Sequence, residues 1–142
     1  MSSLALNRRT STAGYGVTLM RVMLGVVMLM HGWQKFHIDG VSATQAGFAG
    51  MGVPAADTAA LAMIALELVG GALLIVGLGT RVVAALTGLS MLGAIWFAHL
   101  GAGFFAADGG FEYPLTLAVL GFAVALTGPG AAGLDRVVRR RR

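Results

Sequence analysis

The chain has 142 residues, of which 57% are hydrophobic and only 11% are charged, and it contains no cysteine. Water-soluble domains have about 25% charged residues, so this composition excludes an ordinary soluble domain and predicts an integral membrane protein. The lack of cysteine excludes disulfides, thiol redox motifs and thiolate metal sites within this sequence. The formal net charge of +4 comes mainly from C-terminal arginines, which is more typical of a tail beside a membrane than of nucleic-acid binding.

Long apolar segments predict helices that cross the bilayer, since a spanning helix needs about 20 apolar residues. A polar N-terminal tail, which we expect to be irregular and cytoplasmic, comes first at residues 1–14. Glycines and Pro54 make residues 34–55 a linker, in which a short helix on the membrane surface is expected. The sequence predicts one membrane domain at residues 15–130, with spans at 15–33, 57–78, 82–100 and 113–127, and a basic cytoplasmic tail at 131–142.

The charges that flank these segments predict their orientation, because cytoplasmic loops of membrane proteins are rich in Lys and Arg. With both termini in the cytoplasm, the cytoplasmic side carries most of the arginines, namely Arg8, Arg9, Arg81, Arg136 and Arg139–Arg142. The opposite side then carries one lysine and the acids: Lys35, Asp39, Asp57, Asp108 and Glu112. We therefore predict an all-α fold, a four-helix up-down membrane bundle with both termini cytoplasmic.

Small residues recur at helical spacing along three of the predicted spans. Such residues let helix backbones approach closely in lipid, so they predict the faces along which the helices pack. They are Gly70, Gly71, Gly77, Gly88, Gly93, Gly121 and Ala125.

Glu67 lies near the middle of the second span. A charged side chain at that depth costs at least about 2.5 kcal/mol unless it is paired or hydrated. From its depth in the first span we expect Arg21 to be its partner. A structural and a functional interpretation have similar weight. Glu67 and Arg21 form an ion pair that fixes helix register, or they provide a functional site, which is either a proton-accepting site or the polar end of a small-ligand pocket.

A second group of polar residues is expected at the outer ends of the spans. His31 and Lys35 share a helix face with Gln34, while His99 ends the third span and Glu112 begins the fourth. Imidazoles with a carboxylate suit proton exchange near neutral pH or polar contacts to a quinone head group. Interfacial residues that simply face water are the main alternative. A metal site is the least favoured interpretation, because the ligand spacing is not tight.

The order of these residues resembles the DoxX family of small bacterial four-helix membrane proteins, over about residues 17–136. The residues that carry the resemblance are Arg21, Gly25, His31-Gly32, Lys35, Pro54, Glu67, Gly70-Gly71, Gly77, Thr80-Arg81, His99, Glu112, Gly128-Pro129-Gly130 and Asp135. The resemblance implies a place in the bacterial cytoplasmic membrane and an association with thiosulfate:quinone oxidoreduction or oxidative-stress complexes. It also implies distant kinship with membrane-protein assembly factors.

We therefore predict a membrane subunit of a redox-associated complex that holds a quinone-like lipid at buried polar residues. The candidate ligand-binding or proton-exchange residues are Arg21, Glu67, His31, Lys35, His99 and Glu112, and no metal is expected. The sequence shows no complete catalytic set, so an enzymatic role would be that of a subunit in a quinone-linked oxidoreductase. The alternative is a non-enzymatic scaffold or assembly factor. Expected partners are the bilayer, soluble or membrane redox proteins and further copies of the chain, but no nucleic acid.

Overall fold

The computed structural model describes residues 3–140, and within them the chain forms helices joined by turns, with no β-strand. This confirms the all-α prediction. The long helices are α1 (Ser3–Trp33), the chain of α3 (Ala56–Ala65), η2 (Leu66–Gly70) and α4 (Gly71–Val76), α5 (Thr80–Ala94) and α6 (Glu112–Thr127). The shorter ones are η1 (Gln34–Ile38), α2 (Val41–Gly50), η3 (Ile95–His99), η4 (Leu100–Ala102), η5 (Ala106–Asp108) and α7 (Leu134–Arg140).

In the described part of the chain, three helical stretches are long and apolar enough to cross a membrane. They are Thr12–Ile38, Ala56–Val76 and Thr80–Ala102, whereas the apolar helix Glu112–Thr127 is shorter. The expectation of an irregular tail is wrong for residues 3–14, because α1 begins at Ser3. Alanine, leucine and arginine favour helix there, and no proline or glycine interrupts them before Gly14. Residues 1–2 of that predicted tail lie outside the described residues.

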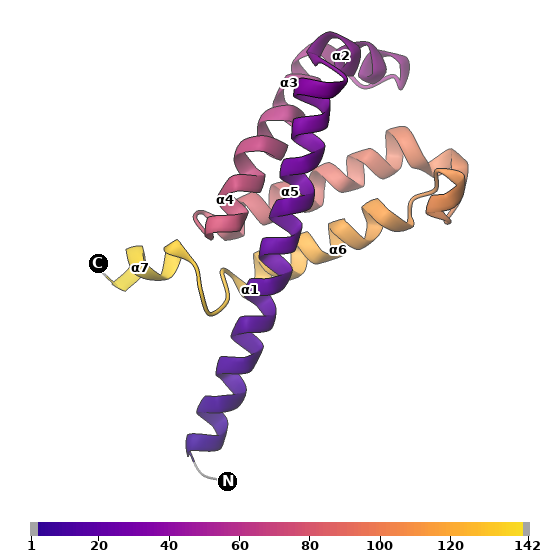
Figure 1. Ribbon diagram of the computed structural model, residues 1–142. Helices are drawn as coiled ribbons and strands as arrows, with labels where there is room; N and C mark the ends of the chain where they lie inside the picture. The colour runs from indigo at the N-terminus through magenta and orange to yellow at the C-terminus, as the bar shows by residue number, and fades with distance from the viewer. Residues whose placement is uncertain (1–2, 141–142) are drawn as a thin grey trace.

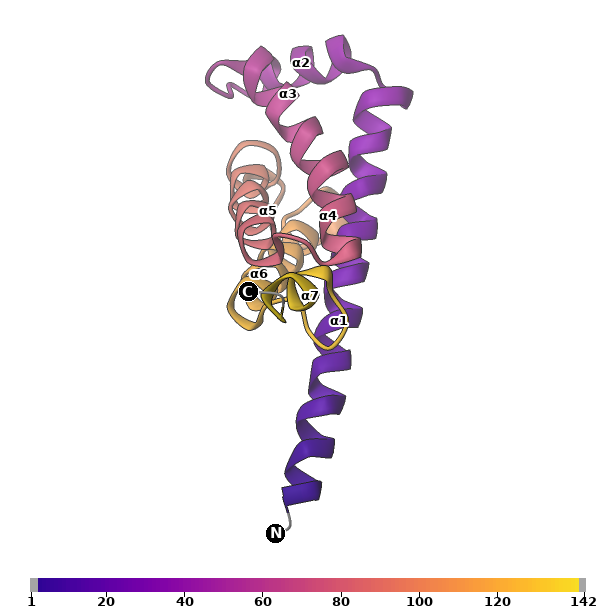
Figure 2. The same cartoon turned by 90° about the vertical axis from the view of Figure 1, so that its left-hand side faces the viewer.

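The long helices form two antiparallel pairs. In one pair α1 lies along η2 and α4, and in the other α5 lies along α6. Both views show the second pair crossing the first rather than running parallel to it (Figures 1 and 2). At one end α2 and α3 pack together. The short helix α2 confirms that the linker contains a helix, while its position on the membrane surface stays a prediction.

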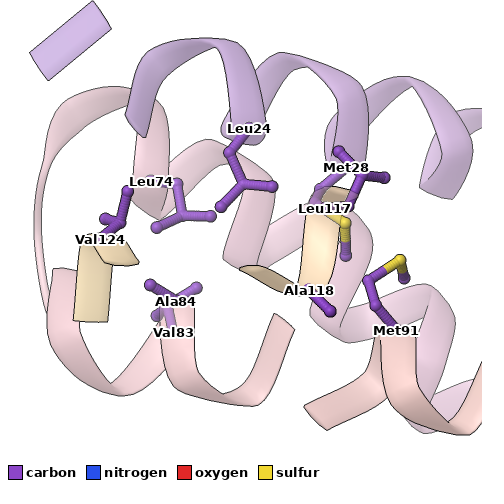
Figure 3. Packing of buried hydrophobic residues seen from close by; sticks show 9 residues of the cluster. All are labelled: Leu24, Met28, Leu74, Val83, Ala84, Met91, Leu117, Ala118 and Val124. Carbon is purple, nitrogen blue, oxygen red and sulfur yellow. The ribbon is translucent and has the colours of Figure 1, made fainter. Parts of the chain in front are cut away.

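The apolar core lies where the two pairs meet (Figure 3). Its buried members come from α1, α4, α5 and α6: Leu24, Met28, Leu74, Val83, Ala84, Met91, Leu117, Ala118 and Val124. Large apolar side chains also cover the outside, where Leu19 is 70% exposed and Leu126 78% exposed. An apolar exterior of this extent is expected of a protein whose solvent is lipid.

Glycines set the closest helix contacts within each pair. A side chain on Gly71 would meet the Gly25 carbonyl oxygen at 2.8 Å, and one on Gly121 would meet the Ala84 carbonyl oxygen at 2.9 Å. This confirms that Gly71 and Gly121 are packing positions, because only a residue without Cβ allows backbones so close. The prediction is wrong for Gly93, where an added Cβ would have no neighbour within 4 Å.

The segment after α6 packs across the end of the bundle that lies near Gly14 of α1. The Ala131 N–H donates to the Gly14 carbonyl at 2.8 Å, and the Asp135 N–H donates to the Gly77 carbonyl at 2.9 Å. The Asp135 carboxylate accepts hydrogen bonds from the N–H groups of Gly79 (2.7 Å) and Thr80 (2.9 Å). Because α5 has no side-chain cap of its own, Asp135 supplies the cap from a distant part of the sequence.

Acid should release this segment from α5. Burial of Asp135 opposes its ionisation, but the hydrogen bonds from Thr80 and Gly79 outweigh it and hold the pKa of Asp135 below its usual value. A carboxyl group whose pKa is lowered by folding stabilises the fold above its unfolded pKa of about 3.9, and loses that contribution as the pH falls through the folded pKa. We expect the amides of Gly79 and Thr80 to be protected from hydrogen exchange at neutral pH and to lose protection in acid.

The measurement is hydrogen exchange by mass spectrometry, corrected for the intrinsic effect of pH on the exchange rate. Asp135→Ala should already lack the protection at neutral pH, with a loss of about 0.5–2 kcal/mol for the missing cap. It should then show little further change on acidification. Protection that is equal in both proteins at neutral pH would contradict the capping role.

Candidate ligand-binding cavity

A cavity of about 540 Å³ lies between the two helix pairs, beyond the apolar core. Its walls are mostly apolar, and they include Met28, Met63 and Leu117. Six polar side chains that can take part in hydrogen bonds also line it: His31, Lys35, Glu67, Ser90, His99 and Tyr113. This size and this mixture of an apolar wall with a few polar groups are typical of small-molecule sites.

Glu67 forms an ion pair with Lys35, with 2.8 Å between Lys35 Nζ and Glu67 Oε1. The Glu67 side chain is only 2% exposed and that of Lys35 is 23% exposed. Gly32 allows α1 to approach Glu67 this closely, because a Cβ at that position would lie only 2.8 Å from the Cβ of Glu67. The close approach of α1 to η2 places Lys35, one turn beyond Gly32, within reach of the buried carboxylate.

The predicted pairing of Glu67 with Arg21 is wrong. Arg21 is buried, but its guanidinium donates to the carbonyls of Leu74 (2.6 Å) and Ile75 (3.1 Å), and also to that of Ala132. The first two carbonyls belong to the last turn of α4, where backbone acceptors have no partner within the helix. Arg21 therefore closes the C-terminal end of α4 and ties the C-terminal segment to it. It is absent from the residues that line the cavity.

Three π-helical segments border the cavity, one on each of three helices. Lys35 belongs to η1, Glu67 and Leu66 to η2, and His99 and Phe97 to η3. A π-helical turn holds an extra residue, which changes the direction of the side chains around it, and such turns are frequent at functional sites. We find no signal in the sequence that would have located these turns.

The two histidines of the cavity have defined tautomers in their neutral forms. His31 Nδ1 lies 2.9 Å from the Val27 carbonyl oxygen, and His99 Nδ1 lies 2.7 Å from the Gly109 carbonyl oxygen. Because a carbonyl oxygen only accepts hydrogen bonds, Nδ1 carries the proton in each ring. The Nε2 atom of each neutral imidazole is then an acceptor.

The structure divides the predicted outer group. It brings His31, Lys35 and His99 together with Glu67 around one cavity. Glu112 instead accepts a hydrogen bond from the Ala106 N–H at 2.7 Å and holds the loop before α6. Gln34 is exposed, and neither Glu112 nor Gln34 lines the cavity. Within residues 3–140, no three His, Asp or Glu side chains are grouped so that they could hold a metal ion.

Two polar residues of the cavity, Ser90 and Tyr113, were not predicted from the sequence as site residues. Tyr113 resembles an ordinary interfacial aromatic residue in the sequence, but its ring lies 6.3 Å from that of His31, measured between centroids. Ser90 donates to the Thr87 carbonyl at 2.8 Å, as a serine within an apolar helix commonly does.

The fold and this cavity define a small multi-pass helical membrane protein with an ion pair in an apolar pocket. The DoxX family profile matches residues 16–100, and the chain belongs to the DoxX family. It is 36% identical over 123 residues to a Bacillus subtilis (strain 168) protein named "Putative oxidoreductase CatD", covering 87% of each chain. It is 31% identical over 129 residues to "Inner membrane protein YqjF" of Escherichia coli (strain K12), covering 89% of this chain and 94% of that protein. No solved structure is significantly similar to it.

Proposed function

We propose that this protein is a membrane subunit of a redox-associated complex and that its cavity holds the head group of a quinone-like lipid. The observation that carries the proposal is the cavity itself, in which an apolar wall surrounds Lys35, Glu67, His31 and His99. A quinone ring suits the apolar wall, and its oxygens suit the polar groups. The name of the Bacillus subtilis relative, an oxidoreductase, agrees with a redox context.

The protein would bind and orient the lipid, while electrons would pass to or from a partner protein. Lys35 Nζ carries three N–H groups and uses one of them on Glu67. The remaining N–H groups can donate to a carbonyl oxygen of the head group. The neutral His31 and His99 rings can accept protons or hydrogen bonds at Nε2.

We also propose that α6 is a fourth span and that both termini face the cytoplasm of a bacterial inner membrane. The hydrogen bonds of Ala131 to Gly14 and of Asp135 to Gly77 support one common side for these four residues. Arg81 and the arginines of α7 lie in or next to the same group of segments, as the positive-inside rule requires of a cytoplasmic side. The name of the Escherichia coli relative supports the inner membrane.

The proposal is tested by purifying the protein in lipid nanodiscs, extracting its lipids and titrating it with a decyl-substituted benzoquinone and the matching hydroquinone. We expect co-purified quinone lipid and saturable binding of at least one of these probes. Ala94→Phe should weaken that binding at least tenfold, because Ala94 lines the cavity and a phenyl ring would occupy it.

Ala72→Phe is the matched control. Ala72 is exposed on α4 and does not line the cavity, so the same enlargement there should leave binding unchanged. If no quinone lipid is extracted and neither redox form binds to the wild type, the proposed function is wrong.

A further inference from the structure

One acceptor atom of the cavity has no partner in the described part of the chain. Glu67 Oε1 is paired with Lys35, but Oε2 is buried and makes no hydrogen bond. A buried carboxylate oxygen without a donor is costly, because burial removes the water that would otherwise satisfy it. Neighbouring side chains cover Oε2, but Glu67 lines the cavity, so a molecule bound there can supply the missing donor once the carboxyl group turns towards it.

The other polar groups of the cavity can likewise be divided into hydrogen-bond acceptors and hydrogen-bond donors. The neutral His31 and His99 rings each offer an acceptor at Nε2, because their Nδ1 protons are used on backbone carbonyls. The donors of the cavity depend less on a ligand for their hydrogen bonds. Lys35 is partly exposed, so water can satisfy its remaining N–H groups. The unmet need of this cavity is therefore for a ligand that donates hydrogen bonds.

We propose that the cavity selects hydroxyl-bearing ligands, and that it therefore holds the hydroquinone form of a quinone-like lipid in preference to the quinone. This inference rests on the proposed function. A hydroquinone hydroxyl donates to Glu67 Oε2, while its oxygen can still accept from Lys35. A quinone has only carbonyl acceptors, so it leaves Oε2 unpaired and brings a second electron-rich oxygen towards the carboxylate.

The expected preference is at least tenfold and reaches about a hundredfold, as for a hydrogen bond to a charged group against an unpaired buried acceptor. Preferential binding of the reduced form stabilises it. The midpoint potential of the bound couple should therefore rise above that of the free couple, by about 30 mV for each tenfold preference.

The experiment compares three decyl-substituted ligands of one ring size on the wild-type protein in nanodiscs, without oxygen. They are the hydroquinone, the quinone and the hydroquinone dimethyl ether, which keeps the aromatic ring and both ring oxygens but carries a methyl group in place of each hydroxyl proton. We expect the hydroquinone to bind at least tenfold more tightly than both others. Equal binding, or tighter binding of the quinone, would overturn the inference while leaving the proposed function in place.

Failure of all three ligands to bind would instead overturn the proposed function, and the inference with it. Glu67→Gln provides a second measurement. Its neutral amide is a weaker acceptor than the carboxylate, so the ratio of the hydroquinone and dimethyl ether affinities should fall towards one. An unchanged ratio of the two affinities would show that Glu67 does not recognise the hydroxyl group of the ligand. Because the comparison of ligands needs only the wild-type protein, it decides the question even where the variant folds poorly.

Discussion

Lys35→Met should lower the free energy of unfolding by about 3–5 kcal/mol, because it leaves the buried carboxylate of Glu67 without its partner. The loss exceeds the value of an ordinary surface ion pair, since Glu67 is almost fully sealed from solvent. Unfolding in mixed detergent micelles, followed through the fluorescence of Trp33 and Trp96, gives the measurement.

The double variant Lys35→Met/Glu67→Gln should recover much of this loss, because it removes the uncompensated charge together with its partner. Gln34→Met is the matched control, since Gln34 is the exposed neighbour of Lys35 and its replacement should change stability by less than about 0.5 kcal/mol. A Lys35→Met protein as stable as this control would mean that the ion pair contributes nothing to the fold.

Arg21→Met should also destabilise the protein, by about 3 kcal/mol. It removes a buried guanidinium that donates to the Leu74, Ile75 and Ala132 carbonyls, and it leaves those acceptors without a partner. Arg21→Lys should recover only part of the loss, because an ammonium group lacks the planar fork that reaches several carbonyls at once. The same unfolding assay measures both variants.

Arg81→Met is the matched control for Arg21. Arg81 donates to the Ala125 and Leu126 carbonyls at the end of α6, but these bonds are exposed. Water can replace them, so the loss there should be below about 1 kcal/mol. Equal losses at the two arginines would show that burial does not set the contribution of Arg21. Ligand affinity of the folded Arg21→Met protein should match that of the wild type, because Arg21 lies outside the cavity.

Much of the fold was predictable because it depends on local composition. Segments such as Ala56–Val76 are apolar for the length of a bilayer and have no internal proline, so helix is the form that satisfies their backbone in lipid. Gly71 and Gly121 were recognisable as packing residues from their spacing. Gly93 shows the limit of that rule, since spacing places a glycine on a helix but does not say whether another helix passes it.

The candidate site was predicted only in part. Glu67 was identified as the central residue because an acid in an apolar helix must be compensated. His31, Lys35 and His99 were identified as polar residues at one end of the spans, and the structure places all three around the same cavity as Glu67. Glu112 was included because it also lies at that end of the spans, but its carboxylate accepts a hydrogen bond from the backbone of the loop before α6.

The pairing error has a physical cause in the register of α1 against the antiparallel chain of η2 and α4. Depth estimated along each span placed Arg21 near Glu67. In the structure, Gly25 faces Gly71 and Gly32 faces Glu67. Arg21 is therefore level with the last turn of α4, where it reaches the Leu74 and Ile75 carbonyls and not Glu67. Register depends on which backbones can approach, and the glycines on both helices decide it together.

The sequence by itself determined that this protein is helical and apolar on its surface, and that a carboxylate must be accommodated within it. These properties follow from single residues and their near neighbours. Only the tertiary structure decided that Lys35 compensates the carboxylate, that Arg21 closes a helix end, and that a cavity forms between the pairs. Those outcomes depend on the contact of helices distant in sequence, on the crossing of the two pairs, and on π-helical turns that redirect side chains.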